Sequence, residues 1–530
     1  MKTKFIFVTG GVVSSLGKGI NASSIGRLLK QRGLKVFMQK FDPYINVDPG
    51  NMSPLQHGEV YLTDDGAETD LDLGHYERFI DERLNKYSSV TSGKIYSAVI
   101  ENERKGKYGG GTVQVIPHIT NEIKKHLNNA AISSNADVVI TEIGGTVGDI
   151  EGLPFLEAIR QFRRDIGYTN TYYIHNTLVP YVAASGEIKT KPTQHSVKEL
   201  RSIGINPDMI ILRTEKSLED SQKEKIALFC DVDQEAVIEA KDEKSIYEIP
   251  LRFADQKVDE IICKHFRLKT KPLDLTDWKE MLSNMKAIKH SVNIALVGQH
   301  VDLKDSYISV LESLHHAGLA NNYHVNTTPI KASELDKDAS ILENYSGIIV
   351  PDGFGNEDVE GMFNAIKYAR EAKIPFLGIC YGMQLAVVEF VKNVLGKKDA
   401  NSIELDSKTK MPIFVYTKKN DVKNKEMRLG LHECLIEKDT LAKAIYKQTV
   451  INERNRHLYE FDNKYLELFE NTDLVVSGIN PHDKAIQIIE LKDHPFFLGV
   501  QFRPEFLSRP YRAHPVFKEF IKNAINKKNQ

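Results

Sequence analysis

The chain has 530 residues, too many for one hydrophobic core, so two or three domains are expected. Apolar residues make up 41% and charged residues 27%, which is typical of a soluble globular protein. Lys and Arg total 70 against 72 Asp and Glu, so no basic excess supports nucleic-acid binding. Four scattered cysteines without CxxC pairs argue against a disulfide framework or a zinc site. No apolar run suits a signal peptide or a membrane span, so we expect a cytoplasmic protein without membrane contact.

Strand-like runs alternate with helix-length spacers along most of the chain, a pattern that predicts βαβ units and parallel sheets. The first series of runs lies at 4–9, 35–41, 137–143, 171–177 and 208–214. The second series lies at 292–300, 323–330, 347–355, 374–384 and 497–502. Between them, 268–291 is charged and contains the only tryptophan. The sequence therefore predicts an α/β fold with two doubly wound domains, at 1–267 and 292–530, joined by a linker at 268–291.

A glycine-containing loop follows the first predicted strand in "FIFVTGGVVSSLGKG", residues 5–19. A helix starting near Gly17 would point its N-terminus at an anion, and Lys18 would add positive charge, so this segment predicts a triphosphate site. It departs from the usual phosphate-loop pattern. Five residues separate Gly11 from Gly17, and Gly19 replaces the hydroxyl residue that normally reaches the metal. We therefore expect carboxylates elsewhere to hold Mg²⁺.

Candidate carboxylates come from two segments. "ETDLDLGHYERF" contributes Asp70 and Asp72 at alternate positions, although a solvated acidic loop would look the same. "VVITEIGGTVGDIE" places Glu142 at the end of an apolar strand, before a glycine turn. Ligands of open α/β sheets bind at such strand ends, so Glu142 is the stronger candidate.

A possible nucleophile lies in the second half, in "IPFLGICYGMQLAVVEF". Gly378, Cys380 and Gly382 form a G-x-C-x-G elbow between a strand and a helix. The N-terminus of that helix is expected to lower the pKa of the thiol and favour thiolate. A buried structural cysteine is the alternative. The last strand, "FLGVQFRPEF", ends with Arg503 and Glu505 where such a cysteine would need a base.

Several long motifs together resemble the CTP synthase family. They are "GGVVSSLGKG", "KFDPYINVDPGNMSPLQHGEVYLTDDGAETDLDLGHYERF", "VQVIPHIT", "EIGGTVGDIE" and "GEIKTKPTQHSVKEL", and they cover nearly all of 1–265. The resemblance implies a P-loop-like amidoligase domain that phosphorylates the 4-oxygen of UTP with ATP. Ammonia then displaces the phosphate, and CTP acts as a feedback inhibitor.

The resemblance assigns residue roles in this half. Lys18 and Lys40 are implied as catalytic groups at the phosphates, and Asp72 and Glu142 as Mg²⁺ ligands. The implied ATP-binding residues are Ser15, Leu16, Gly17, Lys18, Gly19 and Asp72. The implied UTP- and CTP-binding residues are Ser14, Asp149, Ile150, Glu151, Lys189, Lys191, Gln194 and Lys225. Two lysines with a carboxylate-bound Mg²⁺ suit phosphoryl transfer, which chiefly needs positioning and cations.

The second half resembles the class I glutamine amidotransferases, whose cysteine attacks the glutamine amide and releases ammonia. Cys380 and Glu505 match catalytic positions of that family. Gly353, Gln384 and Glu404 match positions that bind glutamine.

Three positions in this half depart from the family pattern. Arg503 stands where the family has the histidine of His-Pro-Glu, and arginine cannot accept a proton. Asp352 replaces a glycine and adds negative charge beside a site for an oxyanion. Leu458 replaces the arginine that pairs with the glutamine carboxylate, a contact of about 1.5–3 kcal/mol. The lid also differs, with Asn424-Lys425-Glu426 near its usual Gly-Gly-Thr.

These departures give the hypothesis that the domain no longer hydrolyses glutamine and that Arg503, next to Glu505, forms a bidentate ion pair with a carboxylate. Free ammonia, or ammonia from another protein, would then serve the first half. Glutamine-dependent synthesis with a displaced base is an alternative, with His432, His457, His482 or His514 as the substitute. Two further alternatives are a non-catalytic scaffold that binds nucleotides and a plain ATPase. The family forms homotetramers and is activated by GTP, an activation that the altered lid and missing histidine call into question here.

Overall fold

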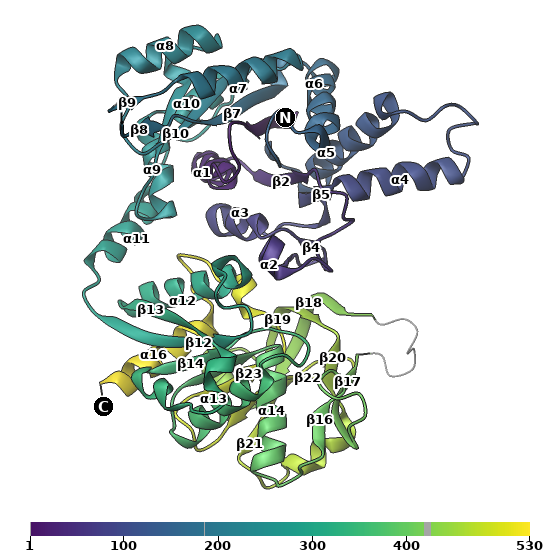
Figure 1. Cartoon of the computed structure of the whole chain (residues 1–530), viewed down its shortest axis with the longest axis vertical. Helices are drawn as coiled ribbons and strands as arrows, with labels where there is room; N and C mark the ends of the chain where they lie inside the picture. Colours follow the sequence, from purple (N-terminus) through teal and green to yellow (C-terminus); the bar gives the residue numbers. More distant parts are fainter. Residues whose placement is uncertain (1, 185, 418–425, 530) are drawn as a thin grey trace. The chain divides into compact units, whose positions relative to one another are not determined.

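The computed structural model describes residues 2–184, 186–417 and 426–529. They form two compact units, one of residues 1–51 and 72–282 and one of residues 52–71 and 283–530. Each unit contains one large sheet with helices on both faces, which confirms the predicted α/β class with two doubly wound domains (Figure 1). In the described ranges, no helix combines the length and the apolar character that a membrane span needs.

The first unit has a seven-stranded sheet whose paired strands are all parallel. In sheet order the strands are β11 (Val237–Lys241), β10 (Met209–Thr214), β7 (Thr171–Leu178), β1 (Lys4–Gly10), β6 (Val138–Ile143), β2 (Val36–Asp42) and β5 (Ser89–Thr91). These are the strands that the apolar runs predicted, with β11 and β5 added at the two edges. Parallel order places all their carboxyl ends at one edge of the sheet.

Helices cover both faces of this sheet. One group is α1 (Lys18–Gln31), α3 (Asp72–Ile80), α9 (Ile249–Asp255) and α10 (Val258–Phe266), and the other includes α4 (Ser92–Arg104), α5 (Thr120–Ser134) and α6 (Leu153–Ile166). The helices α7 (Lys191–Ser202), α8 (Asp220–Cys230) and α11 (Thr276–Ala287) follow later in the chain. Phe5 and Phe7 of β1 pack edge-on against Phe162 of α6. Met38 and Ile140, on the other face, lie beside Gly26 of α1.

The second unit has a nine-stranded sheet with a parallel half and an antiparallel half. Its order is β13 (His324–Lys331), β12 (Ser291–Gly298), β14 (Gly347–Val350), β15 (Phe376–Ile379), β23 (Phe497–Val500), β22 (Ile486–Leu491), β21 (Leu474–Ile479), β18 (Arg428–Ile436) and β19 (Val450–His457). A separate three-stranded sheet consists of β16 (Ala400–Ser402), β17 (Met411–Tyr416) and β20 (Tyr459–Phe461).

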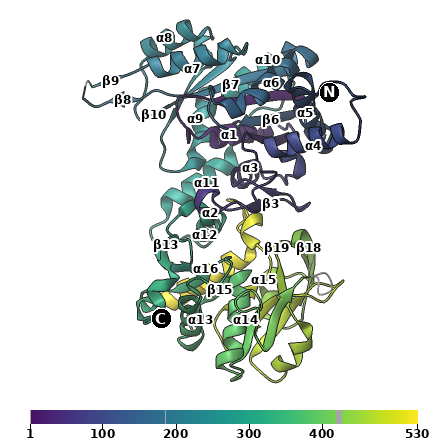
Figure 2. The same cartoon turned by 45° about the vertical axis from the view of Figure 1, so that its right-hand side comes forward.

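Two apolar cores lie on the two faces of the nine-stranded sheet. One contains α13 (Val359–Glu371) and α14 (Tyr381–Asn393), and the other contains α12 (Ile308–Asn321), α15 (Leu441–Tyr446) and α16 (Pro515–Lys528). Figure 2 shows α13 and α14 beside this sheet. Helix α14, whose sequence is largely apolar, is buried along nearly its whole length.

A segment of the first half packs into the second unit. Residues 52–71, with α2 (Pro54–His57), β3 (Tyr61–Leu62) and β4 (Glu68–Thr69), group with 283–530. The Tyr61 ring lies 4.9 Å from that of Phe506, and the buried Arg454 donates to Asp64 Oδ1 at 2.7 Å. This grouping differs from the contiguous domain boundaries expected above, which remain a prediction.

Candidate functional site

A cluster of cations and carboxylates lies at the carboxyl ends of β2 and β6. Lys40 and Glu142 are paired positions of these neighbouring strands, on the face that α1 covers. Lys40 forms an ion pair with Asp72, the first residue of α3, and lies 3.3 Å from Asp42. Lys18, at the start of α1, donates to the carbonyl oxygen of Ile143 at 2.9 Å. The structure thus brings together the four residues implied as catalytic or metal-binding.

Gly19, which departs from the phosphate-loop pattern, leaves space for a metal between two carboxylates. A Cβ atom added at Gly19 would lie 3.1 Å from Asp72 Oδ1 and 3.1 Å from Glu142 Oε2. Two carboxylate oxygens therefore converge where a Ser or Thr side chain would otherwise begin. Hard oxygen donors of this kind suit Mg²⁺. Among the described residues no group of three or more His, Cys, Asp or Glu side chains suits a metal, so this pair would need ligands from phosphates and water.

Burial controls the charges in this cluster. It raises the pKa of Glu142 to about 7, helped by Asp72 and opposed by Lys40 and Lys18. Burial also lowers the pKa of Lys18, although Glu142 favours the charged ammonium. The hydroxyl of Tyr76 donates to Glu142 Oε2. The buried cluster therefore has carboxylates for an additional cation and ammonium groups for a polyphosphate.

The loop between β1 and α1 has the geometry of an anion-binding turn. Val12, Ser15 and Gly17 all have positive φ angles, so backbone amides can turn toward one another. The loop is tied down by Val147, whose N–H donates to the Gly10 carbonyl oxygen at 2.8 Å. Arg213 donates to the Ser15 carbonyl oxygen at 2.5 Å. The loop is therefore held in place while its tip remains open.

The other residues implied as ATP-binding belong to the same loop. Ser15 is exposed, as is Ser14, which the resemblance assigns to the pyrimidine nucleotide, whereas Leu16 is 4% exposed and packs inward. These positions suit a ligand that contacts the outer side of the turn.

The residues implied to bind the pyrimidine nucleotide follow the ends of several parallel strands. Asp149, Ile150 and Glu151 are exposed after β6, and Asp149 Oδ2 accepts from the Thr146 N–H at 2.8 Å. The others lie around the hairpin of β8 (Tyr181–Val182) and β9 (Glu187–Ile188) and on α7 and α8: Lys189, Lys191, Gln194 and Lys225. Lys189 pairs with Glu187, and Lys191 and Lys225 are exposed. Their roles remain predictions.

Two polar residues near the phosphate loop escaped the sequence reasoning. Tyr76 is fully buried against Glu142, and it lies inside the quoted motif "GHYERF" without any distinguishing pattern. His175, in the middle of β7, lies between Thr9 Oγ1 and Ser196 Oγ, at 2.8 Å from each. Burial lowers the pKa of His175 to about 3, so the ring is neutral. A polar side chain inside an apolar strand was the one signal that could have drawn attention to it.

Cys380 occupies the predicted nucleophile elbow of the second unit. It lies between β15 and α14 with φ 53° and ψ −100°, a strained conformation for a residue other than glycine. A Cβ at Gly378 would approach Gly382 to 2.8 Å, and a Cβ at Gly382 would lie 2.0 Å from the Val350 carbonyl oxygen. Both glycines are thus required by close backbone packing at the elbow.

The expected thiolate was wrong. Burial raises the pKa of Cys380 well above its usual value, and Asp352 raises it further, while Arg503 lowers it. The thiol donates to the Arg456 carbonyl oxygen at 3.6 Å, and Gln501 Nε2 donates to Sγ at 3.6 Å. The helix N-terminus does not overcome this burial, and the cysteine is a neutral thiol.

Arg503 is held by two carboxylates, so the expected ion pairing is confirmed, but each carboxylate takes one contact in place of the expected bidentate pair. Its Nε donates to Glu505 Oε1 at 2.5 Å, and its Nη1 donates to Asp352 Oδ2 at 2.5 Å. Arg503 is 6% exposed. Burial alone would lower the pKa of Arg503, but Asp352 and Glu505 outweigh it and raise the pKa.

The positions that match glutamine-binding residues are partly engaged within the protein. Glu404 Oε1 accepts from the Gly355 N–H at 3.0 Å, and burial raises the pKa of Glu404 to about 7. Gln384 Nε2 donates to the Tyr459 carbonyl oxygen at 3.2 Å. Gly353 lies in the loop after β14, where an added Cβ would meet Gln299 Oε1 at 3.0 Å. Leu458, half-buried, offers no charge for a carboxylate.

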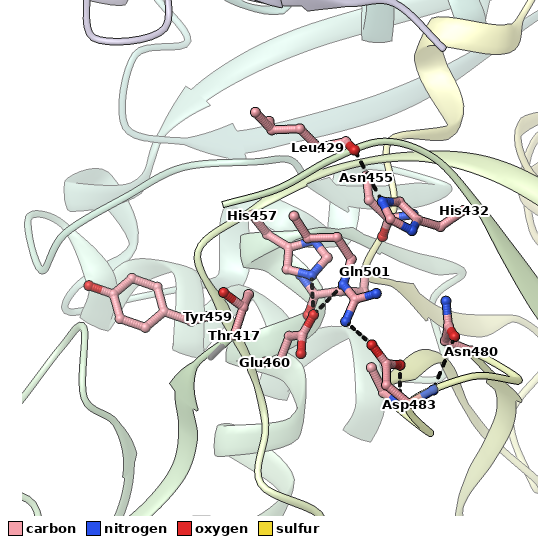
Figure 3. Close-up of polar contacts among 12 residues, drawn as sticks. Thr417, Leu429, His432, Asn455, His457, Tyr459, Glu460, Asn480, Asp483 and Gln501 are labelled. Atoms are coloured by element: carbon pink, nitrogen blue, oxygen red, sulfur yellow. Dashed lines mark hydrogen bonds and ion pairs between the residues drawn. The ribbon is translucent and has the colours of Figure 1, made fainter. Parts of the chain in front are cut away.

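The four candidate substitute histidines each have a partner other than Cys380. His457 Nε2 lies 3.0 Å from Glu460 Oε1, and His432 Nε2 lies 3.1 Å from the Leu429 carbonyl oxygen (Figure 3). His482 pairs with Glu433 and His514 with Glu453, at 3.1 and 2.9 Å. The largest charge effects on the thiol come from Asp352, Arg503 and Glu505. These contacts give no support to a displaced base. Asn424 and Lys425 of the lid lie outside the described residues.

The fold and the two sites define the class of protein. It is a two-domain α/β protein with a ligase-type nucleotide site in one unit and an amidotransferase-type cysteine elbow in the other. Comparisons with known proteins agree. The family description "CTP synthase N-terminus" matches residues 4–268, and "Glutamine amidotransferase class-I" matches residues 302–523.

The chain is similar to curated relatives over their whole length. The chain is 58% identical over 528 residues to a CTP synthase of Geobacillus kaustophilus, covering 99% of each, and 56% identical over 533 residues to that of Bacillus subtilis, covering 100% of each. It is also similar, with 33% identity and a TM-score of 0.42, to the glutaminase domain of a Trypanosoma brucei CTPS with bound acivicin, over 44% of this chain and 94% of that one. The chain belongs to the CTP synthase family, whose members are ligases that form a carbon–nitrogen bond.

Proposed function

We propose that the chain converts UTP to CTP with ATP and ammonia, and that its amidotransferase domain does not hydrolyse glutamine. One observation carries the second part: Arg503 stands at the position of the base and is held between Glu505 and Asp352, beside a neutral Cys380. An arginine in this setting can neither take the thiol proton nor return it to the departing amide nitrogen. The reaction in the first unit therefore needs ammonia from another source.

The first unit contains the groups that UTP phosphorylation requires. Lys18 and Lys40 place two cations at the end of the phosphate loop, where they would neutralise the transferring group. Asp72 and Glu142 would hold Mg²⁺, because their oxygens converge beside Gly19. Bound there, Mg²⁺ would neutralise charge on the phosphate oxygens. The pyrimidine nucleotide would be held by the half-buried Gln194 and by five exposed residues, Asp149, Glu151, Lys189, Lys191 and Lys225.

Further properties of the family extend this proposal. CTP would inhibit by binding the UTP residues, and the nucleotide sites would lie at the subunit interfaces of a homotetramer. The exposure of Lys191 and Lys225 in the single chain is compatible with such a shared site. GTP would have little effect, because the step that it promotes is absent.

The test is CTP formation from UTP, ATP and Mg²⁺, assayed in parallel with ammonium chloride and with glutamine plus GTP. We expect product with ammonium and none with glutamine. Equal activity with glutamine, together with glutamate release that depends on Cys380, would establish a displaced base instead. Failure with both nitrogen sources would favour a scaffold, and ATP hydrolysis without UTP would favour a plain ATPase. Asp72→Ala should abolish turnover in an enzyme, whereas the assembly of a scaffold should tolerate it.

A further inference from the structure

Only one of the two carboxylates that hold Arg503 belongs to the expected catalytic set. Glu505 is that orienting carboxylate, and it is 1% exposed. Asp352 stands in the loop after β14, where the family has a glycine, and its Oδ2 accepts from Arg503 Nη1 at 2.5 Å. A half-buried carboxylate on this loop is stabilised by a cation, and Arg503 supplies that cation. The two departures from the family pattern are therefore physically joined.

We propose that Asp352 is a specificity-determining residue that sets the nitrogen donor of this enzyme by binding Arg503 beside Cys380, so that the charge of Arg503 is not available to the sulfur. This inference rests on the proposed absence of glutamine hydrolysis and names the residue that maintains it. It predicts that replacing Arg503 by histidine does not by itself restore the amidotransferase.

The surroundings of the sulfur favour the thiol over the thiolate. The Arg456 carbonyl oxygen lies 3.6 Å from Sγ and accepts from the thiol, whereas a thiolate would have no hydrogen to donate to it. Gln501 Nε2 is the amide donor on the sulfur, also at 3.6 Å. After burial itself, Asp352 is the strongest influence that raises the pKa of Cys380. Arg503 acts in the opposite direction, but two carboxylates share its charge.

The same geometry explains why a base would fail here while Asp352 remains. An imidazole introduced by Arg503→His would lie between Asp352 and Glu505, both buried or half-buried carboxylates. Two neighbouring negative charges favour the imidazolium form. An imidazolium ion can stabilise a neighbouring thiolate, but here Asp352 would pair with its charge and would still raise the pKa of the Cys380 thiol. Removing Asp352 leaves one orienting carboxylate, the arrangement that general-base catalysis by histidine uses.

The first experiment measures the thiol directly in the full-length chain. Asp352→Asn keeps the size of the side chain and removes its charge. We expect the pH midpoint for alkylation of Cys380 by iodoacetamide to fall, with a rate at pH 8 about tenfold above that of the unmodified chain. A change of access alone would alter the rate at every pH without moving the midpoint. Asp483→Asn, which removes a carboxylate paired with Arg428 in the same unit, is the matched control and should behave as the unmodified chain.

The second experiment measures glutamate release from glutamine. The variant Asp352→Gly with Arg503→His and Leu458→Arg should release glutamate at least about tenfold faster than Arg503→His with Leu458→Arg. Adding Cys380→Ser should abolish that release. Thermal unfolding of every variant checks that the comparison is made between folded proteins.

Two results would overturn the inference: an alkylation midpoint for Asp352→Asn equal to that of Asp483→Asn, or equal glutamate release with and without Asp352. The proposed function fails separately, by glutamate release from the unmodified chain. If the unmodified chain releases no glutamate and either of those two results is found, the proposed function holds but Asp352 has no role in it.

Discussion

Glu404 is a half-buried carboxyl whose protonation changes the free energy of unfolding with pH. Burial raises its pKa from 4.5 to about 7, Asp352 adds to this, and the Gly355 N–H opposes it. A folded-state pKa above the unfolded one means that the stabilising contribution is complete below pH 4.5 and is lost as the pH rises through about 7.

Glu404→Gln should therefore increase the free energy of unfolding at alkaline pH. We expect little difference from the unmodified chain at pH 4.5 and a gain of about 3 kcal/mol at pH 8.5, because the amide is never charged. Denaturant unfolding at both pH values measures this. The exposed Glu470→Gln is the control and should give no pH-dependent difference. A gain of equal size at both pH values would contradict the assigned protonation.

Tyr76 is expected to position Glu142 for the metal. Tyr76→Phe removes the hydroxyl that donates to Glu142 Oε2 and should reduce apparent Mg²⁺ affinity or ammonia-dependent turnover about tenfold. A titration of CTP formation with Mg²⁺ separates the two effects. Tyr173→Phe removes a comparable buried hydroxyl, bonded to the Ile159 carbonyl oxygen at 2.8 Å, and should leave the Mg²⁺ dependence unchanged. Identical Mg²⁺ curves for Tyr76→Phe and the unmodified chain would refute this positioning role.

At the scale of elements, the start of α1 is shaped by its neighbours α3 and β6. Gly19→Ala and Gly19→Ser both place a Cβ within 3.1 Å of the oxygens of Asp72 and Glu142. Both should lower ammonia-dependent CTP formation by about tenfold or more, since the carboxylates must move apart. Steady-state assays at saturating Mg²⁺ test this. Recovery in the serine variant alone would show that a hydroxyl can serve as a metal ligand here.

The sequence predicted strand ends well and charge states poorly. The phosphate loop, the position of Glu142 and the elbow at Cys380 follow from glycine spacing and apolar runs, which are local properties. The thiol of Cys380 is neutral because of burial and because of Asp352, which is 28 positions away in the chain. No local pattern reports such a contact. Tyr76 was missed for the same reason, since its partner Glu142 is distant in sequence.

At the scale of the whole molecule, two α/β halves could be predicted, but the interleaving of the chain could not. Residues 52–71 have no apolar run long enough to signal a domain of their own. Their attachment to the second unit depends on single side chains, such as Tyr61 against Phe506 and Asp64 on Arg454. Such pairs become visible only when both halves of the chain are folded.

A fragment of residues 283–530 should therefore be less stable than the same unit in the full chain. It would leave the buried Arg454 without Asp64 and without the Tyr61 hydroxyl, 3.0 Å from its Nη1. Breaking a buried ion pair from one side costs about 3–5 kcal/mol. Denaturant unfolding of the fragment, with and without an added peptide of residues 52–71, measures the loss and its recovery. A peptide with Asp64→Asn is the control, and full recovery with it would contradict the role of the ion pair.

The neutral thiol of Cys380 also has a pharmacological consequence. Electrophilic glutamine analogues inactivate amidotransferases by two steps, docking through their amino-acid end and capture by a reactive sulfur. On the proposed function, Leu458 would weaken the first step, and the thiol beside Asp352 and the Arg456 carbonyl oxygen would weaken the second. A cell that relied on this enzyme for cytidine nucleotides would resist such drugs at this target. An inhibitor would have to compete for the UTP or ATP site instead.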